Sequence, residues 1–215
     1  MLGRLHYIAS YRGQEDAAGT LELVSIALDA GVPCVQFRAK DCPDRQRYEM
    51  AARVVELCHQ AGATCIINDR VDIARASGAD GAHVGDEDLP VSEARRLLGP
   101  GLLLGATART PEAAARAEAA GASYIGTGPC YLTTTKKGLP PPIGAGGLAR
   151  VTRAVGSPVV AIGGVTAEHV DELIEAGAYG IAVVSAISSA TDPASAVREL
   201  LAKLMAATVL TGGPA

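Results

Sequence analysis

Short runs of apolar and β-branched residues alternate along the chain with longer alanine-rich stretches, and this alternation constrains the fold more than any other feature. It predicts strands that are each followed by a helix leading back to the next parallel strand. Glycine ends several of the helical stretches shortly before a strand, so one unit is repeated. The predicted strands cover residues 5–10, 34–39, 64–69, 81–84, 102–107, 124–128, 159–164 and 180–186. The glycines are Gly31, Gly62, Gly78, Gly121 and Gly177.

Eight units in 215 residues leave about 27 residues for each, near the lower limit for a closed barrel. We therefore predict an α/β protein with one domain, a (β/α)8 TIM barrel over residues 1–215, and a frayed tail over residues 205–215. Only the segment from Arg70 to Gly78 is available for the third helix. Such a short helix leaves a doubly wound sheet of the flavodoxin or Rossmann type as the alternative.

The composition argues against several classes of function. Nineteen Lys and Arg against 23 Asp and Glu give a net charge of −4, unlike a generally basic nucleic-acid-binding protein. With six Tyr, one Phe and no Trp, aromatic platforms for single-stranded nucleic acid are not expected either. The five cysteines form no C-x-x-C pair, which argues against a disulfide framework or a zinc knuckle. No stretch is apolar enough for a signal peptide or a membrane span, so we expect a cytoplasmic protein without nucleic-acid or membrane partners.

Polar residues gather where the predicted strands end. In a barrel these ends meet at one mouth, where the chemistry of such folds is found. The residues at or just after the ends are Gln36, Arg38, Lys40, Asn68, Asp69, the segment 86–88, Thr107, the segment 133–137, Gly163, Gly164, Val184 and Ser185. This clustering predicts a functional site at the mouth.

Two parts of the mouth are suited to bind phosphate. The segment from Thr133 to Lys136 offers hydroxyl donors and a positive charge, and Ser185 and the pair 163–164 follow the last two strands, the usual phosphate position in these barrels. An exposed loop and a tight turn are the alternatives for these segments. Arg38 and Lys40 form a second cationic point on the opposite side. We therefore expect two phosphorylated ligands, or one that is phosphorylated at both ends.

Carboxylates on adjacent strands suggest a magnesium site. Asp69 and the segment 86–88 follow the third and fourth strands, and Mg²⁺ prefers one or two carboxylates together with ligand phosphates. The alternative for 86–88 is a helix cap, which is the only role we expect for Glu87.

The sequence offers no pair of a nucleophile and a base. We expect His83 to be a hydrogen-bonded core histidine, and the other three histidines to be structural or exposed. The cysteines are interpreted as small buried apolar residues, with Cys130 near enough to the mouth to be accessible. The other histidines are His6, His59 and His169.

Six motifs, in this order and with these spacings, resemble those of the thiamine-phosphate synthases, also called thiamine-phosphate pyrophosphorylases. The motifs are QFRAKD at 36–41, INDRVDIA at 67–74, GADGAHVGDEDLP at 78–90, GTGPCYLTTTKKG at 126–138, AIGGV at 161–165 and VVSAI at 183–187. The resemblance covers nearly the whole chain. It implies a transferase that condenses 4-amino-2-methyl-5-pyrimidinylmethyl diphosphate with hydroxyethylthiazole phosphate, or its carboxylated form, to give thiamine phosphate and pyrophosphate by Mg²⁺-assisted ionisation.

The resemblance also implies a role for each residue of the mouth. Lys136, Arg38 and Lys40 would be catalytic, by stabilising the charge on the departing pyrophosphate, and Mg²⁺ would lie on Asp69 and Asp88. The pyrimidine diphosphate would be held by Gln36, Arg38, Lys40, Asn68, Thr107 and Lys136. The thiazole phosphate would be held by Thr133, Thr135, Gly164, Val184 and Ser185.

The chain departs from the family pattern at three positions. It has Ala39 where Glu is usual, Thr107 where Ser is usual and Leu132 where Pro is usual. The first two change the fit of the pocket, but neither removes a phosphate-binding cation or a magnesium carboxylate. Two other functions stay open: a thiazole tautomerase-like isomerase, and a non-catalytic sensor of a phosphorylated ligand. The sequence leaves the oligomeric state open, including a homo-oligomer.

Overall fold

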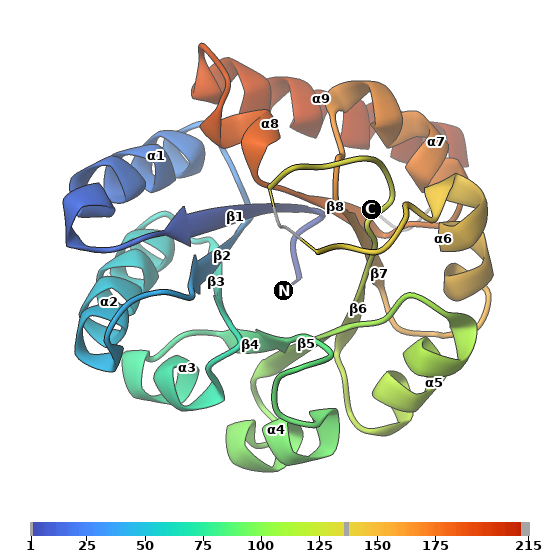
Figure 1. Ribbon diagram of the computed structural model, residues 1–215. Helices are drawn as coiled ribbons and strands as arrows, with labels where there is room; N and C mark the ends of the chain where they lie inside the picture. The colour runs from blue at the N-terminus through green and yellow to red at the C-terminus, as the bar shows by residue number, and fades with distance from the viewer. Residues whose placement is uncertain (1, 136–137, 212–215) are drawn as a thin grey trace.

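The computed structural model describes residues 2–135 and 138–211 of the 215-residue chain. Eight parallel strands form a closed barrel in chain order, and β1 pairs with β8 to close it. The helices surround the barrel (Figure 1). This confirms the predicted (β/α)8 barrel and excludes a doubly wound sheet.

The strands are β1 (Leu5–Tyr11), β2 (Cys34–Ala39), β3 (Thr64–Asn68), β4 (Gly81–Val84), β5 (Leu103–Thr107), β6 (Tyr124–Thr127), β7 (Val159–Ile162) and β8 (Gly180–Val183). The helices are α1 (Ala17–Asp29), α2 (Asp44–Gln60), α3 (Val71–Ser77), α4 (Val91–Leu98), α5 (Pro111–Ala119), α6 (Gly144–Thr152), α7 (Val170–Glu175), α8 (Ser185–Ser188) and α9 (Pro193–Thr211). Two 3₁₀ turns, η1 (Gln14–Asp16) and η2 (Ala167–His169), precede α1 and α7.

Several strands end earlier than predicted, because the backbone turns away from strand geometry at the mouth. β3 stops before Asp69, whose φ is 66°, and β7 stops before Gly163 and Gly164, whose φ values are 90° and 69°. β8 stops at Val183, and α8 begins two residues later at Ser185. The polar residues of the mouth therefore lie on turns just beyond the strands.

Strand alternation divides the interior into two apolar regions. On β1, Leu5, Tyr7 and Ala9 face outward into the large core between the strands and the helices. Ile8 faces inward and packs with Tyr124 and with residues of β7 and β8 in a smaller cluster within the barrel. The outer core holds the helices against the barrel.

The short third unit folds because α3 needs only seven residues to pack. Val71, Ile73 and Ala74 are its buried side chains. It ends at Gly78, which adopts the left-handed conformation with φ 73° and donates its N–H to the Ala74 carbonyl. A longer helix is therefore not required in this unit.

Helix α5 has a side-chain cap: Oγ1 of Thr110 accepts from the Ala113 N–H at 3.2 Å, and Pro111 occupies the first turn. Helix α9, the last helix of the chain, continues to Thr211. The helix thus includes much of the segment that we expected to be frayed.

None of the helices in residues 2–135 and 138–211 is long and apolar enough to cross a membrane.

Gly81→Ala tests how tightly the strands approach one another. A Cβ at Gly81 would lie 2.2 Å from the Leu103 carbonyl oxygen, a backbone atom that cannot swing aside. We expect a loss of about 2–3 kcal/mol in the free energy of unfolding, measured by urea denaturation. Gly146→Ala is the control, because a Cβ in that helical position meets nothing within 4 Å and should stabilise by up to about 1 kcal/mol. Equal stability of Gly81→Ala and wild type would contradict this account.

Candidate active site

A cavity of about 620 Å³ opens at the carboxyl ends of the strands. Every predicted site residue that the structure describes lines it. Lys136 lies outside the described residues. The lining set includes Gln36, Arg38, Lys40, Asn68, Asp69, Asp88, Thr107, Thr133, Thr135, Gly164, Val184 and Ser185. A second, more open hollow beside Tyr131 and His169 contains only Gly164 of this set.

Arg47 fixes the loop that carries the cations of β2. Its side chain is 8% exposed, and its guanidinium donates to the carbonyls of Ala39, Lys40 and Cys42 at 2.8, 3.0 and 2.9 Å. These bonds hold the backbone of Lys40, whose Nζ lies 3.0 Å from a carboxylate oxygen of Asp69. The ammonium group therefore lies at the end of the adjacent strand, β3.

Asp69 is held in an unusual conformation. In the described part of the chain it is the one residue other than glycine with a positive φ, at 66°. Its N–H donates to the His83 carbonyl at 2.7 Å, and the Asn68 amide donates to its carboxylate. Burial raises the pKa of Asp69, a hydrogen bond with Asp88 raises it further, and Lys40 opposes the shift. Two carboxyl groups thus meet in a partly desolvated place.

The acidic segment after β4 does not cap a helix, so our expectation for Glu87 is wrong. Helix α4 begins at Val91 after Pro90, with no side-chain cap. Leu89 and Pro90 separate the acidic residues from the helix. The Asp88 carboxylate instead accepts from the Gly85 N–H at 2.7 Å, which turns it back over the cavity. Within the described residues no group of three or more His, Cys, Asp and Glu is placed to hold a metal ion. Asp69 and Asp88 are a pair of carboxylates that interact with each other.

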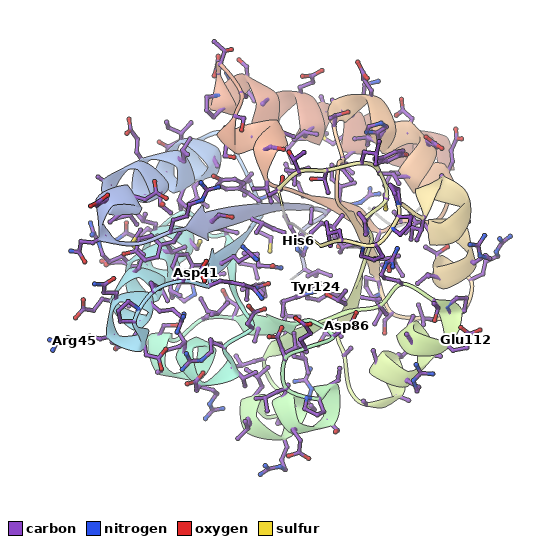
Figure 2. All side chains as sticks on the ribbon, viewed as in Figure 1. His6, Asp41, Arg45, Asp86, Glu112 and Tyr124 are labelled. Carbon is purple, nitrogen blue, oxygen red and sulfur yellow. The ribbon has the colours of Figure 1, made fainter. Side chains whose placement is uncertain are left out.

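Polar side chains line part of the cavity floor inside the barrel, where Figure 2 labels His6 and Tyr124 near the centre. His83 is buried and hydrogen-bonded as predicted: its Nδ1 lies 3.1 Å from the Tyr124 hydroxyl and its Nε2 3.0 Å from Oγ1 of Thr107. Nε2 of His6 lies 2.9 Å from the Gly3 carbonyl, while its Nδ1 is buried and has no partner among the described residues. The floor therefore presents neutral hydrogen-bonding groups.

The other two histidines lie outside the cavity, and one cysteine differs from expectation. His59 pairs with Asp80 at 3.3 Å, and the His169 ring stacks on Tyr131 at 3.7 Å between centroids. Cys42 is only partly buried, unlike the other cysteines. Cys130 is 1% exposed, which confirms its interpretation as a buried residue, so its nearness to the mouth does not make it accessible. Its N–H donates to the Ile162 carbonyl, which folds the loop after β6 back over the thiol. Burial raises the pKa of this thiol to about 11.

The hydroxyl-bearing side of the mouth is built where the loop after β6 crosses β7. A Cβ on Gly164 would lie 2.5 Å from the Leu132 carbonyl oxygen, so only glycine permits this crossing. Beyond it, Thr133 donates to the Thr135 hydroxyl at 3.2 Å, and the Thr135 N–H lies 3.3 Å from the Thr133 hydroxyl. Ser185 faces the same cavity from the start of α8. The hydroxyl groups of the loop after β6 and of the start of α8 thus line the same side of the cavity.

Sequence reasoning missed Tyr124 and Arg109, which both line the cavity. Strand alternation in β6 could have placed Tyr124 inside the barrel. Arg109 follows the end of β5 by two residues, and it donates to the carbonyls of Gly128 and Pro141 at 2.9 and 2.7 Å. It therefore ties both ends of the loop after β6 to the preceding unit, between β5 and α5.

Comparison with known proteins gives a consistent result. A family model described as thiamine monophosphate synthase matches residues 7–187. A thiamine-phosphate synthase of Salinispora arenicola is 54% identical over 197 residues, which are 91% of this chain and 94% of that protein. One from Haloquadratum walsbyi is 44% identical over 205 residues, 94% of this chain and 92% of that protein.

Solved structures agree with the sequence comparison. A thiamine phosphate pyrophosphorylase from Pyrococcus furiosus superposes with a TM-score of 0.84 at 34% identity, over 95% of this chain and 96% of that chain. A 3-hexulose-6-phosphate synthase gives a TM-score of 0.68 at 19% identity, over 94% of this chain and the whole of the other. The second likeness shows the shared barrel alone.

The buried histidines predict a loss of stability in mild acid. Burial lowers the pKa of both His6 and His83 from 6.5 to about 4. The unfolded chain therefore binds protons first as the pH falls below about 6.5, and the stability present above that pH is lost toward pH 4. Between pH 7 and pH 5, each of the two histidines should lower the free energy of unfolding by about 2 kcal/mol.

Urea denaturation of His6→Gln at both pH values measures one share of this loss. The variant should lose about 2 kcal/mol less than wild type between pH 7 and 5. Gln60→Asn, an exposed substitution that changes no titratable group, is the control and should keep the wild-type pH dependence. An unchanged pH dependence in His6→Gln would show that His6 does not titrate on unfolding.

Proposed function

The chain belongs to the thiamine-phosphate synthase family of transferases, and on that premise we propose that it joins 4-amino-2-methyl-5-pyrimidinylmethyl diphosphate to hydroxyethylthiazole phosphate or its carboxylated form. The products would be thiamine phosphate and pyrophosphate. The observation that carries the proposal is that one cavity collects cations, a carboxylate pair and two groups of hydroxyls. One mouth can then bind two phosphorylated substrates side by side.

The pyrimidine diphosphate would lie between β2, β3 and β5. Arg38 and Lys40 supply positive charge to the diphosphate, and Lys136 joins them in this proposal. Asn68, Thr107 and Gln36 supply neutral hydrogen bonds deeper in the cavity. Since Lys40 already pairs with Asp69 at 3.0 Å, a bound diphosphate would share this cation with the carboxylate.

The thiazole phosphate would lie on the opposite side. Thr133, Thr135 and Ser185 offer hydroxyl donors, and Gly164 and Val184 offer backbone near them. The hydrogen bonds between the two threonines hold their hydroxyls together without any ligand. This preorganisation reduces the cost of ordering the loop around a phosphate.

The proposed reaction needs charge stabilisation more than proton transfer. The carbon–oxygen bond to the diphosphate breaks, and pyrophosphate leaves with the electron pair. The amino-pyrimidine stabilises the resulting carbocation, and the thiazole nitrogen attacks it with its lone pair. Arg38, Lys40 and Lys136 would act as the catalytic cations, and Arg38 and Lys40 line the cavity in which the negative charge of the leaving group would grow. This agrees with the lack of a nucleophile and base pair in the sequence.

The carboxylate pair fits the proposed cofactor, Mg²⁺. Asp69 and Asp88 share a hydrogen bond, and burial together with Asp88 raises the pKa of Asp69, so two negative charges there oppose each other. A divalent cation would relieve this repulsion, and Mg²⁺ characteristically takes only one or two carboxylates and completes its shell with water and phosphate. When bound, Mg²⁺ would supply positive charge to the leaving diphosphate.

The two other candidate functions are separated by one experiment. Mixing both substrates with the protein should release pyrophosphate in proportion to thiamine phosphate formed. An isomerase would alter the thiazole compound without pyrophosphate, and a sensor would bind without turnover. The intact Arg38, Lys40, Asp69 and Asp88 favour the transferase, since an isomerase needs no diphosphate site.

We also propose a cytoplasmic location, which the five free cysteines support. A homo-oligomer stays a prediction.

Mg²⁺ should bind weakly alone and at least about tenfold more tightly with inorganic pyrophosphate, because the two carboxylates leave most coordination positions to other ligands. Isothermal titration calorimetry measures both affinities, after subtraction of Mg²⁺ binding to free pyrophosphate. Asp88→Asn should lose this gain, whereas Asp86→Asn, at another position lining the cavity, should keep it. Equally tight Mg²⁺ binding without pyrophosphate would count against the site.

Ser185→Asp should weaken the thiazole substrate selectively. A carboxylate at this position would repel the thiazole phosphate, raising its KM by about 10- to 100-fold in a solvent-screened mouth. The KM of the pyrimidine diphosphate should stay within about twofold of wild type. Ser185→Ala is the matched control and should show a smaller rise, because it only removes a hydrogen bond. Equal rises in both Michaelis constants would mean that the mouth is not divided into two anion sites.

A further inference from the structure

Arg109 is a cation of the cavity lining that the proposed mechanism does not use. It lies two residues beyond the end of β5, and its neighbours fix its backbone. The Ala108 N–H donates to the Gly126 carbonyl at 3.0 Å, and Thr110 caps α5. Among the described residues no carboxylate forms an ion pair with the Arg109 guanidinium. Its donors are therefore available to other partners.

Two carbonyls at the two ends of the loop after β6 accept hydrogen bonds from this guanidinium. Nε donates to the Gly128 carbonyl at 2.9 Å, and Nη2 donates to the Pro141 carbonyl at 2.7 Å. The guanidinium is planar, so the angle between its donors is fixed, and hydrogen bonds from a charged donor are about twice as strong as neutral ones. Arg109 thus fixes both ends of the loop relative to β5.

The exit of the loop has few other ways to be held. Residues 140–142 are three consecutive prolines, which have no N–H and can be tied only through their carbonyls. The next two N–H groups, of residues 143–144, donate to the carbonyls of residues 129–130 at 2.9 and 3.0 Å. These bonds close the base of the loop within its own unit. Without Arg109 the loop should therefore stay closed but lose its fixed direction relative to β5.

The direction of the loop decides where its hydroxyls lie. Thr133 donates to the Thr135 hydroxyl at 3.2 Å, and the Thr135 N–H lies 3.3 Å from the Thr133 hydroxyl. Within residues 2–135 and 138–211 these two threonines form hydrogen bonds only with each other. The place of the pair in the cavity therefore depends on how the ends of the loop are held.

We propose that Arg109 is a positioning residue for the thiazole phosphate: it ties the loop to the segment between β5 and α5, so that the hydroxyls of Thr133 and Thr135 face this phosphate. The inference rests on the proposed function, since it takes the two threonines as part of the thiazole site. A loop that is already held needs less ordering when the phosphate binds. The tie therefore strengthens binding without touching the ligand.

Arg109→Met tests the tie, because it removes both donors and keeps an unbranched side chain. Isothermal titration calorimetry with hydroxyethylthiazole phosphate, in the absence of the pyrimidine substrate, should show an affinity about tenfold lower than that of wild type. The affinity for the pyrimidine diphosphate with Mg²⁺ should fall by less than about threefold, since Arg38 and Lys40 would hold it from β2. Arg109→Lys keeps the charge but has no planar fork, so its affinity for the thiazole phosphate should lie between those of wild type and Arg109→Met.

Arg153→Met is the matched control. The Arg153 guanidinium donates to the Ala149 carbonyl of its own helix at 2.9 Å, away from the cavity lining, so this variant should keep the wild-type affinity for the thiazole phosphate. Far-UV circular dichroism shows whether each variant is folded. If Arg109→Met does not fold, Arg109→Lys takes its place in the measurements.

A double-mutant cycle distinguishes positioning from direct contact with the phosphate. Thr135→Val removes a hydroxyl of the loop. If Arg109 acts through this hydroxyl, Arg109→Met should add less than about threefold to the loss of Thr135→Val, although it costs about tenfold alone. Ser185→Ala lies at the start of α8, outside the loop, and there the two losses should multiply. A guanidinium that binds the phosphate itself would multiply with both.

The inference is overturned if wild type does not bind the thiazole phosphate, if Arg109→Met binds it as wild type does, if the pyrimidine diphosphate shows the larger loss, or if the losses of Arg109→Met and Thr135→Val multiply. Its failure is separable from that of the proposed function. A protein whose losses do not multiply, but which releases no pyrophosphate from the two substrates, retains the tie and loses the proposed reaction. A protein that releases pyrophosphate while the losses multiply does the reverse.

Discussion

The closure of the sheet between β1 and β8 is the constraint on which the rest of the structure depends. His6 pairs with Ala182 across this seam, so all eight strands direct their carboxyl ends to one mouth and their inward side chains share one space. The strands can approach closely because glycine has no side chain at two of the contacts between them. A Cβ at Gly81 or Gly180 would lie 2.2 Å from a carbonyl oxygen of the neighbouring strand or its flanking residue. Another glycine makes room for Tyr124 inside the barrel, since a Cβ at Gly105 would lie 2.2 Å from Cζ of Tyr124.

The direction of the strands explains why the mouth could be predicted from the sequence. In a parallel barrel the residue at each strand end must face the same opening, whatever the separation along the chain. Polar residues as distant as Gln36 and Ser185 therefore line one cavity. Even the short α3 agreed with the expected repeat, because the unit needs only enough helix to cover its strand. The fold and much of the cavity lining therefore follow from alternation and strand direction, although Tyr124 and Arg109 were missed.

The errors arose where a contact depends on a segment folding back. Glu87 was expected to cap a helix, but Leu89 and Pro90 move the start of α4 beyond its reach. Cys130 lies next to the mouth in sequence, and a backbone bond to Ile162 buries it. The contact of Tyr124 with His83 depends on which inward residues occupy the same level of the barrel, and this requires the register of strands whose contacting residues lie 41 residues apart in the chain. Local pattern carries no such register.

The cavity separates charge from neutral hydrogen bonding by depth. Lys40, Asp69 and Asp88 lie at the rim, where solvent lowers the cost of holding charge, whereas His6 and His83 are buried and burial keeps their pKa values at about 4. The proposed reaction separates a cation from pyrophosphate and would benefit from this order, because the leaving group would depart toward the charges while the ring would rest on neutral groups. A charged group in the floor would interact with the carbocation itself. The hydrogen-bonded floor can instead orient the ring without adding charge to the place where the cation forms.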